Sequence, residues 1–159
     1  MGTRRAAHIP DWSPKLMTEM NMRGFVRAFC DAFLTHDANQ VAAWLDDDVD
    51  WLVLGPIDLF PFFGKRSGKD AVLAMYADID AHLDIRSCEK DSTLVDGTRA
   101  ASMIKLTAVH KQTNRTLSIR LAHFTEFRSG KVVRMRALLD SFDFAEQALG
   151  REIDLTAAA

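Results

Sequence analysis

The second half of the chain consists of four apolar-rich stretches separated by very short turns. The stretches cover residues 84–95, 99–112, 116–127 and 132–140, and the turn signals between them are DG, TN and SG. Turns this short join antiparallel neighbours, because a parallel connection needs a crossover of a dozen residues or more. We therefore predict an antiparallel meander for this half.

Helical periodicity is concentrated in the first half. A 3, 4, 3, 4 spacing of apolar residues predicts a long first helix, and its members are Met22, Phe25, Val26, Phe29 and Phe33. A strand is predicted at 49–54, and the helical period returns over 69–83. Segregation of helices from the meander indicates an α+β fold, in which a curved antiparallel sheet wraps around the first helix in a cone shape.

The chain has the size of one domain. Its 159 residues are predicted to form an N-terminal extension at 1–20, a single domain at 21–150 and a short tail at 151–159. The extension contains Pro10 and Pro14 and has no sustained period.

Charge and hydropathy exclude two classes of partner. The formal net charge is −2, which provides no general attraction to nucleic acid, and no apolar run approaches the roughly 20 residues that cross a bilayer. We predict a cytoplasmic protein. Cys30 and Cys88 have neither CxxC spacing nor a Cys/His cluster, so they are predicted to be free buried thiols, and no metal site is expected.

Two stretches carry a family resemblance. Residues 46–76, DDDVDWLVLGPIDLFPFFGKRSGKDAVLAMY, and residues 122–142, AHFTEFRSGKVVRMRALLDSF, resemble SnoaL-like proteins of the nuclear transport factor 2-like superfamily. The resemblance extends over roughly residues 20–149 and implies a cone-shaped pocket. The superfamily includes ketosteroid isomerases, polyketide cyclases, dehydratases, epoxide hydrolases and modules that only bind, so the fold alone does not define a reaction.

Ketosteroid isomerases of this superfamily use a carboxylate base on the first strand, and an oxyanion hole built from a tyrosine and a protonated aspartate. Here the base position is occupied by Leu52 and the first-helix tyrosine position by Phe29. Tyr76 matches a supporting tyrosine, and His123 takes the place of the oxyanion-hole aspartate. A steroid isomerase mechanism of that type is therefore not expected.

The epoxide hydrolases need a carboxylate that activates water, an acid and an arginine. The corresponding positions are Leu121, His123 and Ala137, of which only His123 could act. SnoaL-type cyclases need little more than an acid/base carboxylate and an apolar cavity that holds the substrate folded. For that chemistry His123 and Asp140 are the candidates.

Strand alternation places His123 on one face with Ile119 and Leu121, which we expect to point inward. Two roles remain open for it. It is either a neutral core imidazole that is hydrogen-bonded to a backbone carbonyl or to Tyr76, or a proton donor or acceptor in a pocket.

Asp140 follows the last strand and can cap a closing helix. It could instead form an acid/base pair with His123, although alternation puts it on the face of Arg134 and Arg136, where an ion pair with Arg136 competes. Tyr76 is predicted to point inward. The other histidines receive no site role: His110 is expected at the surface, and no function is assigned to His8, His36 and His82.

The predicted ligand-binding residues are apolar: Phe29, Phe33, Trp51, Phe60, Phe63, Met135 and Leu139. We expect Phe60, Phe62 and Phe63 to divide between closing the pocket and contacting a partner subunit. The outward sheet face is expected to pair two copies as a homodimer.

Two function classes follow. The first is an enzyme that acts by proton transfer on a small, mostly apolar carbonyl compound of polyketide or steroid type, as an isomerase, cyclase or dehydratase without metal or cofactor. The second is a module that only binds such a ligand or a partner. The number of titratable groups that converge in the pocket separates them.

Overall fold

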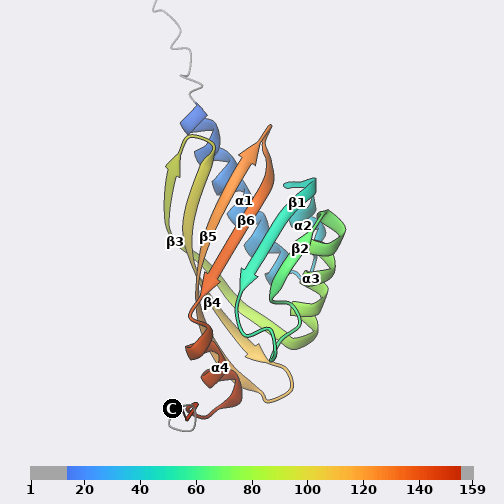
Figure 1. The fold of residues 1–159 in the computed structure, drawn as a ribbon, viewed down its shortest axis with the longest axis vertical. Helices are drawn as coiled ribbons and strands as arrows, with labels where there is room; N and C mark the ends of the chain where they lie inside the picture. The colour runs from blue at the N-terminus through green and yellow to red at the C-terminus, as the bar shows by residue number, and fades with distance from the viewer. Residues whose placement is uncertain (1–13, 155–159) are drawn as a thin grey trace, which may run out of the picture.

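A single six-stranded sheet, with α1 lying across one of its faces, forms the body of the molecule (Figure 1). The computed structural model describes residues 14–154. In chain order the elements are α1 Pro14–Leu34, α2 Asn39–Ala42, β1 Leu45–Leu54, β2 Gly64–Ser67, α3 Lys69–His82, β3 Leu83–Asp96, β4 Arg99–His110, β5 Arg115–Arg128, β6 Lys131–Leu139 and α4 Ser141–Leu149.

The strand order is β2-β1-β6-β5-β4-β3. The predicted meander is confirmed, because β3, β4, β5 and β6 pair with their sequence neighbours in antiparallel fashion. The sequence did not indicate that β1 pairs with β6 in parallel, or that the short β2 pairs with β1. The four residues of β2, GKRS, have no apolar alternation that could have marked a strand.

The two faces of the sheet differ in burial. On β5 every second side chain is buried on the face that α1 covers, and these residues are Leu117, Ile119, Leu121, His123, Thr125 and Phe127. Their neighbours in sequence, such as Phe124, lie on the opposite face, which we call the outer face. This period of two is what positions His123 inside the molecule.

The first helix is longer than its apolar period indicated. It begins at Pro14, so residues 14–20, which the sequence assigned to an extension, belong to α1. Thr18 is buried, and its hydroxyl donates to the carbonyl oxygen of Gly97 at 2.6 Å. The start of α1 is thus attached to the β3–β4 turn. Within residues 14–154 no helix combines the length and the hydropathy required to span a bilayer.

A disulfide joins α1 to β3. The prediction of two free thiols is wrong, because Cys30 and Cys88 are bonded to each other with a Cα–Cα distance of 5.3 Å. They are separated by 58 residues in sequence, and only the packing of α1 on the sheet brings them together. Neither spacing nor local pattern could have revealed the pairing.

The last strand ends at a capped helix. The backbone N–H groups of Phe142 and Asp143 donate to Asp140 Oδ1 at 3.1 and 3.0 Å, which confirms the predicted N-cap. At the other end Gly150 adopts φ 67°, the left-handed conformation that terminates many helices. The cap fixes α4 against the end of the sheet.

Candidate functional site

A small cavity lies between α1, α3, α4 and the concave face of the sheet. Its volume is about 60 Å³, and we call it the central cavity. Its wall is apolar except for His123 and the indole N–H of Trp51, which has no hydrogen-bond partner among the described residues. The predicted ligand-binding residues at this wall are Phe29, Phe33, Trp51, Phe63, Met135 and Leu139.

His123 is the one titratable side chain among the residues that line this wall. It is fully buried, and its ring packs edge-on against Phe29 with the ring centroids 4.6 Å apart. Neither ring nitrogen has a hydrogen-bond partner among the described residues. Burial lowers the pKa of His123 from 6.5 to about 3, because the charged form would lose its hydration. Near neutral pH the imidazole therefore offers one N–H donor and one acceptor nitrogen to whatever enters the cavity.

Tyr76 lies on α3, where it packs beside Phe29 and Phe33. Its ring stacks on Phe33 at 4.8 Å and meets Phe29 edge-on at 6.1 Å. The hydroxyl is buried without a partner in residues 14–154, and burial raises the pKa of Tyr76 well above its usual value. Tyr76 is a wall residue of a neighbouring cavity and does not line the central one.

Asp140 does not form an acid/base pair with His123, because it does not line the central cavity. It is exposed and its carboxylate caps α4, while the preceding residue, Leu139, lines the central cavity. Of the residues that the structure describes, no Asp or Glu lines this cavity, and no group of three or more His, Cys, Asp or Glu could hold a metal ion. His123 therefore has no carboxylate beside it at the cavity wall.

An aromatic cluster closes the end of the cavity beside α4. Phe62, Phe63 and Phe144 contribute to the cavity wall, whereas Phe60 packs behind them against Phe144 at 5.3 Å. The predicted role of Phe60 at the pocket wall is therefore wrong. The three phenylalanines of the 60–63 segment are all buried within the chain.

His110 is buried rather than exposed, so its predicted surface position is also wrong. The segment that carries Phe60 folds over the end of β4, which puts the two rings 5.4 Å apart. The Nδ1 atom of His110 is hydrogen-bonded to the hydroxyl of Thr113 at 2.7 Å. Burial, and to a smaller extent the charge of His82, lowers the pKa of His110. The hydrogen bond and the ring contact give His110 a structural role beneath the aromatic cluster.

Together these features define a class of protein: an α+β cone with a curved, unclosed sheet, a long first helix and an apolar cavity between them. The family model of the SnoaL-like domain matches residues 26–135. The chain therefore belongs to the SnoaL-like domain family, as its sequence motifs indicated.

Solved structures agree with this family. A Rhodopseudomonas palustris protein described as an isomerase is 40% identical, with a TM-score of 0.76 over 82% of this chain and 97% of that one. A Xanthomonas campestris protein described as a polyketide cyclase is 16% identical, with a TM-score of 0.67 over 86% and 99% of the two chains. A Mycobacterium tuberculosis epoxide hydrolase is 14% identical, with a TM-score of 0.65 over 91% and 98%. The last two show the fold alone, and no curated protein matches the chain.

Proposed function

We propose that this protein binds a small, mostly apolar carbonyl compound in the central cavity, with His123 as its hydrogen-bond donor. The observation that carries the proposal is a fully buried imidazole without a partner, in a wall whose other side chains are apolar apart from the indole N–H of Trp51. An unpaired buried polar group costs about 1 to 3 kcal/mol, so its retention in a cavity suits a ligand that supplies the missing partner. A carbonyl oxygen accepts from the neutral imidazole and needs no second polar group.

Cavity size sets the class of ligand. A volume of about 60 Å³ is well below the roughly 300 to 1,000 Å³ of sites for drug-sized molecules. A short ketone suits the cavity as it stands. A polyketide- or steroid-sized ligand would require Phe62, Phe63 and Phe144, the aromatic wall, to move outward.

The test is a titration with 2-butanone followed by NMR of the His123 ring and the β5 amides. We expect saturable shifts in the wild type, and affinity lower by about twofold to tenfold in His123→Leu, which removes one net hydrogen bond. Ala137→Leu is a matched control, because Ala137 faces His123 on the neighbouring strand and a larger side chain there fills the cavity. This variant should abolish the shifts. Equal affinity in the wild type and His123→Leu would contradict the proposal.

A second candidate function is a proton-transfer isomerase that acts on the same kind of ligand. It is supported by the 40% identity to the Rhodopseudomonas palustris protein described as an isomerase. Exchange of the α-protons of 2-butanone in D₂O separates the two functions, since an isomerase of this type must remove such a proton. Because no carboxylate of the described residues lines the cavity, we expect the exchange rate of buffer alone. Acceleration that disappears in His123→Leu would favour the isomerase.

We also propose that two copies associate through the outer face. Exposed apolar side chains gather there, with Leu94 at 75% and Phe124 at 53% exposure, beside Leu54 and Leu138. Strand register places Leu94, Ala101 and Phe124 in one cross-strand row. They border a groove of about 460 Å³ that a second copy would fill.

A row of alternating charge flanks this apolar patch. In order across the sheet it consists of Asp96, Arg99, Glu126, Arg134 and Asp50. Within the chain, Arg99 lies 3.8 Å from Glu126 and Arg134 lies 3.6 Å from Asp50. Alternating signs at the rim allow two copies to match opposite charges around an apolar centre.

Light scattering after size exclusion tests the association. The wild type is expected at twice the chain mass of 17.8 kDa, and Phe124→Asp at the mass of one chain, because a carboxylate would be buried at the centre of the patch. Arg120→Asp, which also lies on the outer face but outside the groove, is the matched charge control and should remain a dimer. A monomeric wild type at tens of micromolar would refute the proposal.

A further inference from the structure

A second cavity adjoins the central one between the end of α1, α3 and the start of β3. Its volume is about 160 Å³, and we call it the side cavity. Four side chains line both cavities and form the partition between them: Phe33, Ile79, Leu83 and Ile85. The two cavities therefore share a wall of side chains, and a ligand that extends from one into the other must displace part of it.

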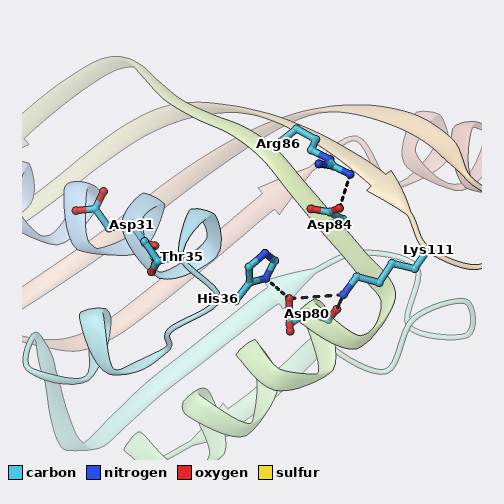
Figure 2. A network of polar contacts seen from close by, with 7 residues as sticks. All are labelled: Asp31, Thr35, His36, Asp80, Asp84, Arg86 and Lys111. Atoms are coloured by element: carbon cyan, nitrogen blue, oxygen red, sulfur yellow. Dashed lines mark hydrogen bonds and ion pairs between the residues drawn. The ribbon is translucent and has the colours of Figure 1, made fainter.

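A histidine paired with a carboxylate lies at the wall of the side cavity. His36, just after α1, has its Nδ1 atom 2.5 Å from Asp80 Oδ1 on α3, and Figure 2 shows the imidazole directed at this carboxylate. Lys111 Nζ lies 3.7 Å from the same Oδ1 atom and donates to the carbonyl oxygen of Asp80. The neighbouring Asp84 is paired with Arg86 at 2.5 Å, which leaves the Asp80 carboxylate to His36 and Lys111.

This pairing determines the tautomer of neutral His36. An ionised carboxylate only accepts hydrogen bonds, so Nδ1 carries the proton that is donated to Asp80. The lone pair then resides on Nε2, which is available to accept from a hydroxyl. Asp80 thus acts as a positioning residue for His36.

Tyr76 provides a second, independent polar group. It lines the side cavity, is buried to 4% exposure, and its hydroxyl has no partner among the described residues. Buried tyrosine hydroxyls are normally hydrogen-bonded, so this one also points to a ligand atom that would complete it. A ligand hydroxyl has the hydrogen-bonding capacity for both groups, since it can donate to the lone pair of His36 Nε2 and accept from the Tyr76 hydroxyl.

We propose that the side cavity binds a hydroxyl group at the far end of the ligand whose carbonyl is held by His123. The inference rests on the proposed function and narrows the ligand class to an apolar ketone that ends in a phenol or alcohol. Such a ligand places its oxygen atoms at the two ends, and its apolar body replaces the contacts of Phe33, Ile79 and the other partition residues.

The experiment compares 4-(4-hydroxyphenyl)-2-butanone with its methyl ether, which contains the same ketone and body but no hydroxyl donor. Affinities are measured by calorimetry or NMR on the full chain. His36→Gly is the principal variant, because His36 has φ 56° and glycine adopts this left-handed conformation without strain. We expect it to weaken binding of the phenol about threefold to tenfold and to leave the ether unchanged.

Two further variants make the outcome specific. Asp80→Asn removes the carboxylate that holds Nδ1–H, and is expected to weaken the phenol but not the ether. His82→Ala is the matched control: its Nδ1 atom is also hydrogen-bonded, to the carbonyl oxygen of Asp78 at 2.7 Å, but it does not line the side cavity. Because its ring packs against Phe62 of the central cavity wall, the expectation concerns the comparison: His82→Ala should leave the ratio of the two affinities unchanged.

The inference is overturned if His36→Gly affects the two compounds equally or neither of them. In that case, continued binding of 2-butanone to the wild type would leave the proposed function standing. Failure of 2-butanone and of both aryl ketones to bind would reject the two proposals together.

Discussion

Acidification from pH 6.5 to pH 3 is expected to reduce the free energy of unfolding by about 4 kcal/mol through His123 alone. Folding lowers the pKa of His123 to about 3, so the unfolded chain binds this proton more readily than the folded one. Above pH 6.5 neither state holds the proton, and the full stability is present. As the pH falls below 6.5, only the unfolded state is stabilised by protonation, with a slope of about 1.4 kcal/mol per pH unit.

The measurement is urea unfolding as a function of pH for the wild type and His123→Leu. The variant should lack this component and retain the pH dependence of the other groups. At pH 7 it should also be more stable by about 1 to 3 kcal/mol, because it removes a buried imidazole without partners. His82→Gln, at a half-buried position, leaves His123 in place and is expected to keep the loss of stability on acidification that His123 causes. Superimposable curves for the wild type and His123→Leu would show that the imidazole is not buried as described.

Removal of the Cys30–Cys88 disulfide is expected to lower the free energy of unfolding by about 4 kcal/mol. The bond closes a loop with a sequence separation of 58 residues, and chain entropy in the unfolded state predicts a loss of this size, within a usual range of about 2 to 5 kcal/mol. Urea unfolding with and without dithiothreitol measures it. The double variant Cys30→Ala, Cys88→Ala should match the reduced wild type and should not respond to the reductant.

An unchanged unfolding midpoint under reducing conditions would contradict this expectation.

The disulfide also links two elements that line the cavities. It attaches α1, which contributes Phe29 and Phe33, to β3, which contributes Leu83 and Ile85. Disulfides persist in oxidising compartments and are rare in the cytosol. The cytoplasmic location inferred from composition therefore remains a prediction, and this bond argues against it.

Local patterns in the sequence were sufficient for the long elements of the fold, although not for β2 or for the start of α1. Alternation on β5 placed His123 inside with Ile119 and Leu121, because successive side chains of a strand point to opposite faces. The position of Asp140 before a helical period predicted its N-cap for an equally local reason. The motifs at 46–76 and 122–142 led to the SnoaL-like family, which the family model confirmed.

The properties of the candidate site were decided by contacts between residues far apart in the chain. His36 and Asp80 are 44 positions apart, at the ends of two helices, and Cys30 and Cys88 are separated by 58. A periodic pattern shows which face of an element is buried, but it contains no information about which other element covers that face.

The sequence by itself therefore determined the α+β class, the inward histidine and the family. Tertiary structure decided that the cavity is small, that the imidazole has no carboxylate beside it, and that the 60–63 segment covers His110. The physical reason is that cavity volume and proton affinity depend on the packing of many side chains at once, whereas strand and helix periods depend only on neighbours along the chain.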